Sequence, residues 1–137
     1  MADLRTELAS VVRDMPGVVS LYLFGSVAEG REHLESDVDV GVLLDRAVYP
    51  TERDRFDRRL LLGTALRDAA RREADVVILN DAPPTLARAI VTRGERIVCR
   101  DAELDHAFVR DAQLLAADID PWLRRMRAIK LAAGERR

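Results

Sequence analysis

Residues 25–30 read Gly-Ser-Val-Ala-Glu-Gly, and residues 36–39 read Ser-Asp-Val-Asp. The first piece follows the apolar run Leu21-Tyr22-Leu23-Phe24, so a glycine and a serine stand where a predicted strand ends. Backbone N–H groups that are exposed after a strand, where a helix begins, attract anions. The sequence therefore predicts a phosphate-binding turn at Gly25 and Ser26. Ser26 is also suited to cap the helix that follows, with Glu29 three residues on, and the two roles are compatible.

Two acids stand one residue apart at the start of the next predicted strand. Side chains alternate between the faces of a strand, so Asp37 and Asp39 point the same way while Val38 and Val40 point into the core. The Cα atoms of the two acids lie about 6.5 Å apart in a strand. A divalent cation between the carboxylates relieves their repulsion. The sequence predicts a metal site here, beside the phosphate-binding turn.

A third acid, Asp75, stands at the head of the apolar run Val76-Val77-Ile78-Leu79. Three acids that converge on one site can hold two Mg²⁺ ions through oxygen ligands. We expect Asp37 and Asp39 to bind the ions, and Asp75 to bind the ion on the nucleophile side and to accept its proton. The alternative is that Asp37 caps the strand end, Asp39 pairs with an arginine and Asp75 only begins a strand.

Apolar runs and helical periodicity predict an α/β (α+β) fold, with strands alternating with helices along the chain. Strands are expected at residues 18–24, 38–44, 75–79 and 96–99, and helices at 3–14, from Thr51 onward, at 85–93 and at about 102–133. Pro121 is expected to split the last helical region in two, since proline removes a backbone donor. We expect a single domain over residues 1–137, with the catalytic core at about 18–100.

The long helix that Thr51 can cap has apolar residues at helical spacing. Its arginines, Arg55 among them, are expected largely outside its buried face, which consists of Phe56, Leu60, Leu66 and Ala70. The strand at residues 75–79 is apolar after its first residue, which predicts burial on both of its faces.

The composition indicates a folded protein that works apart from membranes and nucleic acids. The chain has 137 residues, 48% of them hydrophobic, and a formal net charge of -2. A protein that coats nucleic acid needs surplus positive charge, so no direct nucleic-acid partner is expected. No apolar run is long enough for a bilayer and no leader stands at Met1, so we expect a soluble, cytoplasmic protein. Cys99, the only cysteine, is expected to be a buried and unreactive thiol.

The spacing of these residues resembles a known family. Gly25-Ser26, ten intervening residues, Asp37-x-Asp39 and the later acid Asp75 are similar to the motif of minimal nucleotidyltransferases in the DNA polymerase β-like superfamily. The short length resembles, more narrowly, the MntA-type antitoxins, whose partners are HEPN-domain toxin ribonucleases. The resemblance implies a mixed sheet of about four strands flanked by helices, ATP with Mg²⁺, and transfer of a nucleoside monophosphate with release of pyrophosphate.

For the antitoxin branch, the resemblance implies transfer of AMP to a tyrosine hydroxyl of the toxin, which would block its RNA-cleaving site. Gly25 and Ser26 match the phosphate contact, Asp37 and Asp39 the metal ligands, and Asp75 the third acid. Many relatives have Arg or Lys where this chain has Glu29, and a carboxylate repels a triphosphate. Either Arg31 takes over the phosphate contact or nucleotide binding is weakened.

Two other functions stay open at this stage. One is nucleotide transfer to a small molecule such as an aminoglycoside, for which so short a chain has little material to build an acceptor pocket. The other is a non-catalytic antitoxin that neutralises its partner by covering it. For either function a homo- or hetero-oligomer is possible, and the sequence does not decide the oligomeric state. The natural contact for the second is an apolar stripe near the C-terminus, formed by Trp122, Leu123, Met126 and Ile129.

Overall fold

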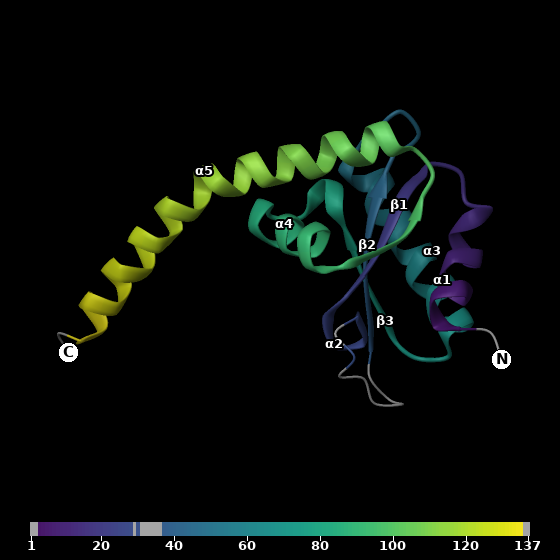
Figure 1. Cartoon of the computed structure of the whole chain (residues 1–137), viewed down its shortest axis with the longest axis horizontal. Coiled ribbons are helices and arrows are strands. Elements are labelled where there is room, and N and C mark those ends of the chain that lie inside the picture. The colour runs from purple at the N-terminus through teal and green to yellow at the C-terminus, as the bar shows by residue number, and fades with distance from the viewer. Residues whose placement is uncertain (1–2, 29, 31–36, 136–137) are drawn as a thin grey trace.

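A four-stranded sheet in the order β3-β2-β1-β4 forms the centre of the computed structural model, which describes residues 3–28, 30 and 37–135 (Figure 1). Its strands are β1 (Val18–Phe24), β2 (Val38–Leu44), β3 (Ala74–Ile78) and β4 (Glu95–Cys99). β1 pairs antiparallel with both β2 and β4, whereas β2 pairs parallel with β3. The expected mixed sheet is therefore confirmed, and the parallel pair is the part of it that carries the acids.

The central strands β1 and β2 are buried along almost their whole length, which explains why both read as nearly continuous apolar runs. β3 differs, because it lies at the edge of the sheet and the helices cover it incompletely. Val76 and Ile78 are buried, but Val77 is only half-buried and Asp75 is exposed. The prediction that residues 75–79 are buried on both faces is therefore wrong, and Leu79 belongs to the short 3-10 turn η1 (Leu79–Asp81).

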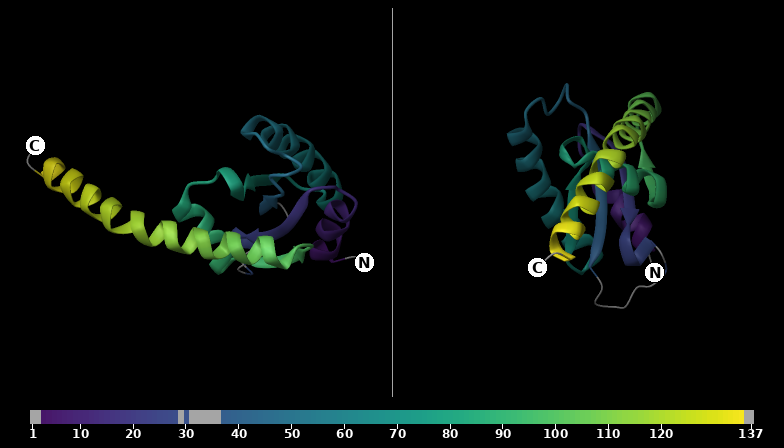
Figure 2. Two further views of the ribbon diagram at one scale, coloured as in Figure 1. Left: turned by 90° about the horizontal axis from the view of Figure 1, so that it is seen from above. Right: turned by 90° about the vertical axis from the view of Figure 1, so that its left-hand side faces the viewer.

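Helices cover both faces of the sheet (Figures 1 and 2). On one face α1 (Leu4–Arg13) and α3 (Glu52–Ala70) contribute Leu8, Val12, Leu62 and Leu66 to the larger core. On the other face α4 (Pro84–Arg93) contributes Ile90, and α5 (Ala102–Glu135) packs Phe108 against the same smaller core. A single helical turn, α2 (Gly25–Ala28), follows β1 directly.

α3 begins where the sequence predicts but turns a different face to the core. Thr51 caps it through a capping box, in which Thr51 Oγ1 accepts from the Asp54 N–H at 3.0 Å. Phe56 and Leu60 are 51% and 57% exposed, so their predicted burial is wrong, while Leu66 is buried as expected. Arg55, expected outside, is only 4% exposed.

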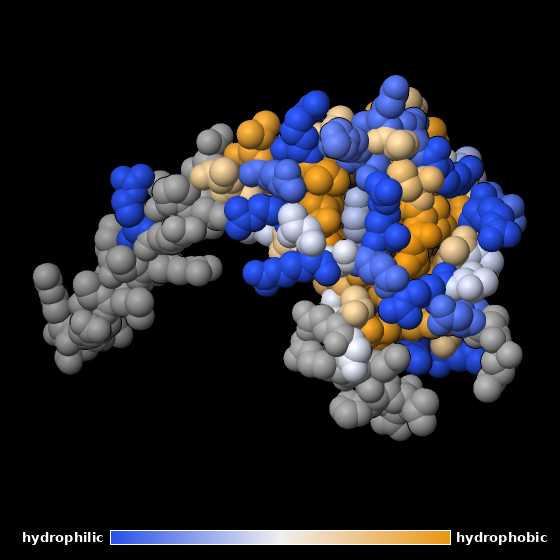
Figure 3. All heavy atoms as spheres, in the orientation of Figure 1, coloured by the Kyte–Doolittle hydropathy of each residue, from blue (hydrophilic) through white to orange (hydrophobic). Residues whose placement is uncertain are grey.

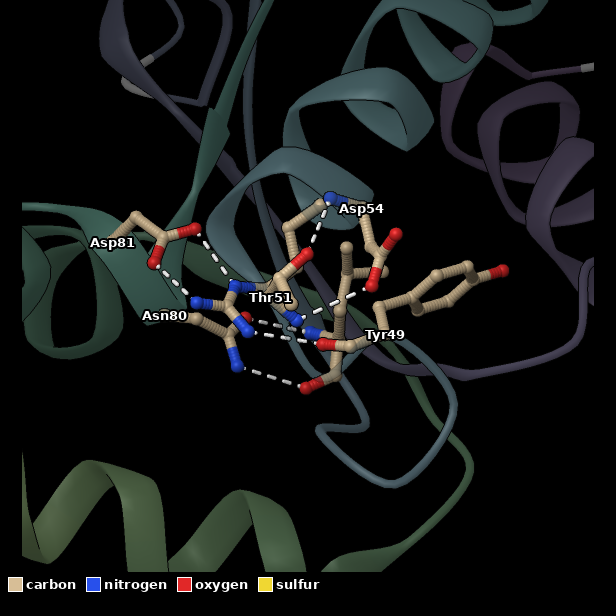
Figure 4. Close-up of polar contacts among 7 residues, drawn as sticks. Tyr49, Thr51, Asp54, Asn80 and Asp81 are labelled. Atoms are coloured by element: carbon tan, nitrogen blue, oxygen red, sulfur yellow. Dashed lines mark hydrogen bonds and ion pairs between the residues drawn. The ribbon is translucent and has the colours of Figure 1, made fainter.

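The burial of Arg55 has a clear physical cause in the segment after β3 (Figure 4). Its guanidinium donates from Nε and Nη2 to the two carboxylate oxygens of Asp81, each at 2.8 Å, and from Nη1 to the Tyr49 carbonyl at 2.9 Å. A fork of this kind satisfies the charge and lets the guanidinium leave water. Asn80 holds the same segment to the end of β2, exchanging hydrogen bonds of 2.9 Å with the Leu44 backbone in both directions. α3, η1 and β2 are thus fixed to one another.

Two further predictions are wrong at the other end of the chain. α5 continues through Pro121 as one helix of 34 residues, which extends away from the domain with a bend (Figures 1 and 2). Loss of one backbone donor bends a long helix without ending it when the flanking turns stay bonded. Cys99 is exposed, because it is the last residue of the other edge strand, β4. The side chains of the predicted apolar stripe from Trp122 to Ile129 lie outside the described part.

The surface of the domain mixes apolar and charged side chains. Figure 3 shows apolar atoms reaching the surface between charged ones on the face that it draws. In the described part of the chain, no helix combines the length and the hydropathy needed to cross a membrane.

Candidate active site

Asp39 and Asp75 lie side by side on neighbouring strands. In the parallel pairing of β2 with β3, Asp39 is the register partner of Asp75. Register partners point to the same face of a sheet, and neighbouring strands are about 4.8 Å apart. Asp37, two residues before Asp39, lies at the same end of the sheet. The fold thus brings together the three acids that the sequence singled out.

The pKa of the Asp39 carboxyl reflects its closeness to Asp37 and Asp75. Asp39 is half-buried, whereas Asp37 and Asp75 are exposed. Burial raises the pKa of the Asp39 carboxyl, and the negative charges of Asp75 and then Asp37 raise it further. We refer to Asp37, Asp39 and Asp75 as the carboxylate cluster, and in the absence of a cation its members repel one another.

Gly25 is the residue of the turn that lies against the carboxylate cluster. It has a positive φ of 78°, a backbone conformation that favours glycine. Phe24, just before it, is the register partner of Asp39 across β1 and β2, so the turn starts beside the acid. A Cβ at Gly25 would overlap with the Asp39 carboxylate oxygen Oδ2. Figure 1 shows α2, which starts at Gly25, at the end of the sheet where β2 and β3 begin.

Several predicted residues of the turn lie outside the described part of the chain. These are the side chain of Ser26 together with Glu29 and Arg31. The backbone of Ser26 belongs to α2. The predicted phosphate contacts of Ser26 and Arg31, and the effect of Glu29, therefore stay predictions.

The chemistry of the carboxylate cluster fits a hard cation. Aspartate oxygens are the ligands that Mg²⁺ prefers, and the raised pKa of Asp39 marks a place where positive charge would be favourable. Among residues 3–28, 30 and 37–135, no three His, Cys, Asp or Glu side chains are grouped closely enough to surround one ion as they stand. To surround one ion, the side chains of the cluster would have to turn toward it.

A buried carboxylate outside this site, which sequence reasoning missed, holds α5 to the sheet. Asp105 is 2% exposed and accepts from the Tyr22 hydroxyl at 2.7 Å and from Arg96 Nη1 at 2.9 Å. Burial alone would raise the pKa of Asp105, but the hydrogen bonds outweigh burial and lower it. Burial and the Asp105 hydrogen bond raise the pKa of the Tyr22 hydroxyl well above its usual range. Because Asp105 of α5 is paired with both Tyr22 of β1 and Arg96 of β4, this network has a structural role.

Comparison with known proteins defines the class. The family described as Polymerase beta, Nucleotidyltransferase matches residues 6–103, which include all four strands and the carboxylate cluster. The chain therefore belongs to this nucleotidyltransferase family, and the resemblance that the sequence motif suggested is confirmed.

Within the family, the chain is similar to antitoxins of the MntA type. It is 31% identical over 94 residues to the protein adenylyltransferase MntA of Shewanella oneidensis. That match covers 66% of this chain and 62% of the relative, so it spans less than two thirds of the relative's length.

Solved structures agree with this placement. A crystal structure of a toxin-antitoxin with AMP-PNP has a chain 26% identical to this one, with a TM-score of 0.68, and the match covers 89% of this chain and 97% of that one. A rebuilt structure of the tri-AMPylated Shewanella oneidensis HEPN toxin in complex with MNT antitoxin matches at 23% identity and a TM-score of 0.63, covering 90% and 95%. At that identity the second likeness concerns the fold.

Proposed function

We propose that this chain transfers AMP from ATP to a tyrosine hydroxyl of a HEPN-domain toxin and thereby acts as its antitoxin. The observation that carries the proposal is the register of Asp39 with Asp75, which gathers the carboxylate cluster beside the Gly25 turn. The name of the curated relative, a protein adenylyltransferase, and the AMP-PNP in a similar structure support the nucleotide and the protein acceptor.

Each acid has a role in the proposed reaction. Asp37 and Asp39 would hold Mg²⁺, with Asp75 completing a site for two ions. When bound, Mg²⁺ neutralises charge on the triphosphate and favours ionisation of the acceptor hydroxyl. The hydroxyl oxygen bonds to the α-phosphorus, the bond from that phosphorus to the bridging oxygen breaks, and pyrophosphate leaves. Asp75, exposed at the start of β3, accepts the hydroxyl proton.

The turn would bind the triphosphate. Gly25 leaves room for the Asp39 carboxylate and for backbone approach. Ser26 would contact the phosphates, and Arg31 would supply the positive charge that Glu29 does not. Because the reaction consumes ATP and acts on an RNA-cleaving toxin, its place in the cell would be the cytoplasm.

The test uses the purified chain, ATP, Mg²⁺ and the HEPN-domain protein encoded beside its gene. Intact-mass measurement should show AMP added to that protein by the unmutated chain and by Asp57→Asn, an exposed control on α3. The double variant Asp37→Asn, Asp39→Asn should add none. No adduct with the unmutated pair, or no HEPN-domain reading frame beside the gene, would contradict the proposal. Protection of cells by the double variant would favour neutralisation by covering.

A further inference from the structure

Two adjoining cavities lie along the outer side of β3. One, of about 300 Å³, lies toward the C-terminal end of the strand and is lined by residues that include Phe56, Val77 and Leu86. The other, of about 440 Å³, lies toward its N-terminal end and is lined by residues that include Leu60 and Asp75. Both are also lined by Phe56, Arg59 and Val76, so they form one continuous surface feature. We call it the β3 groove and define it by Phe56, Arg59, Leu60, Asp75, Val76 and Leu86.

Both sides of the β3 groove carry exposed apolar side chains. Phe56 and Leu60 stand one helical turn apart on α3 and are 51% and 57% exposed, and Leu86 of α4 is 39% exposed. Large apolar side chains gathered in a groove mark a place where a partner binds. Leu61 offers a useful contrast, since it is also 57% exposed but lines neither cavity.

The floor of the β3 groove is the edge of the sheet. In the described part of the chain, β3 has a neighbouring strand only on the β2 side. The Val76 carbonyl accepts a hydrogen bond from Arg59 Nε at 2.8 Å, so Arg59 already occupies one acceptor of this edge. An extended segment of another protein can add to such an edge through backbone hydrogen bonds, with its side chains filling the flanking apolar surface.

The groove leads to the carboxylate cluster, because Asp75 belongs to both. A strand rises about 3.3 Å per residue, so the length from Asp75 to Ile78 is about 10 Å, or roughly three to four residues of an extended peptide. A segment seated along this length brings one of its side chains to Asp75 while its neighbours contact Phe56 and Leu60. An acceptor for nucleotide transfer must reach the same carboxylate.

We propose that the β3 groove binds the hydroxyl-bearing segment of the acceptor protein in extended form. Apolar side chains of that segment lie against Phe56 and Leu60, and its hydroxyl lies at Asp75. This inference rests on the proposed function and names the surface that selects the acceptor. Leu60 is then a specificity-determining residue for the protein substrate and has no part in binding the nucleotide.

The test compares Leu60→Asp with Leu61→Asp, two equally exposed neighbours on α3. The rate of AMP addition to the HEPN-domain protein is measured against its concentration. We expect Leu60→Asp to raise the KM for that protein by about tenfold or more, the effect of losing one central apolar contact, and Leu61→Asp to change it less than about twofold. AMP-PNP binding, measured by calorimetry, should be the same in both. Equal KM values, or lost AMP-PNP binding in Leu60→Asp alone, would overturn the inference.

A binding measurement separates this inference from the proposed function. In the double Asp37→Asn, Asp39→Asn background, affinity for the HEPN-domain protein is compared for Leu60→Asp and Leu61→Asp. A selective loss in Leu60→Asp supports the groove even if the unmutated chain adds no AMP, and equal affinities overturn it. Phe56→Ser serves as a second variant, and thermal melting checks that each variant is folded.

Discussion

Asp39→Asn should make the protein more stable while it abolishes nucleotide transfer. The carboxyl of Asp39 has a raised pKa because of burial and because Asp75 and Asp37 lie close to it. The ionised form therefore costs free energy of folding at neutral pH. An asparagine has nearly the same shape and carries no charge, so the substitution removes the repulsion while keeping the packing against Gly25.

The stability gained by Asp39→Asn can be estimated from the spacing of β2 and β3. Asp39 and Asp75 are register partners, and charges about 5 Å apart repel by about 0.8 kcal/mol in water and by about 3 kcal/mol at an effective dielectric constant of 20. Asp75 is exposed, so screening favours the lower end of this range. We expect about 1 kcal/mol of added stability, which for a chain of this size corresponds to a rise in Tm of about 3–5 °C.

The pH dependence of stability tests separately whether Asp39→Asn stabilises the protein. A carboxyl whose pKa is raised by folding binds more protons in the folded than in the unfolded state, so stability falls as pH rises from the ordinary value of 3.8 through the raised value. The advantage of Asp39→Asn should be present at pH values above the raised pKa and vanish below about pH 4. Thermal melting without divalent cations measures it, with Asp57→Asn as the matched control. A lower Tm for Asp39→Asn at pH 7, with the control unchanged, would refute the reasoning.

Three further substitutions test other parts of the structure. Gly25→Ala should lower stability by about 1 kcal/mol or more, because the φ of Gly25 is positive, and thermal melting measures this loss. It should also abolish AMP transfer, measured by intact mass, because a Cβ would displace the Asp39 carboxylate. Thr51→Ala should cost about 1 kcal/mol in urea unfolding through loss of the helix cap, without changing AMP-PNP affinity. Asp105→Asn should cost about 2 kcal/mol at pH 7, since its carboxylate accepts a buried hydrogen bond from Tyr22 and a partly buried one from Arg96. Because the pKa of Asp105 is lowered, that cost should shrink as pH falls below about 4 and through the lowered value.

The local parts of the fold were readable from the sequence. Period-two alternation placed Asp37 and Asp39 on one face of a strand, and the Thr51 cap and the four strands fell close to their observed positions. What alternation cannot supply is strand order. The meeting of Asp39 with Asp75 depends on the parallel pairing of β2 with β3. The sequence offered Asp75 as a third acid because it begins an apolar strand, and the family resemblance supported that choice, but neither gives the strand pairing.

The face that α3 buries could not be read from hydropathy. Arg55 is buried because Asp81, far along the chain, meets its guanidinium with two oxygens, and no local pattern reports that partner. Once Arg55 faces inward, the helical rotation of about 100° per residue turns Phe56 away from the core. Phe56, which periodicity assigned to the core, thus becomes part of the β3 groove. The inward position of Arg55 explains both the wrong prediction for Phe56 and its exposure in the groove.

The carboxylate cluster works against the stability of the fold that holds it. Gly25 leaves space for the Asp39 oxygen, and strand register sets Asp75 beside it, so the backbone keeps the acids close despite their repulsion. A ligand that binds only the folded state adds RT ln(1 + [L]/Kd) to stability. If the cluster holds Mg²⁺, adding Mg²⁺ should therefore raise the Tm of the unmutated protein and raise that of Asp39→Asn much less. Equal shifts in the two proteins would mean that the cation binds elsewhere and that the repulsion within the cluster has another purpose.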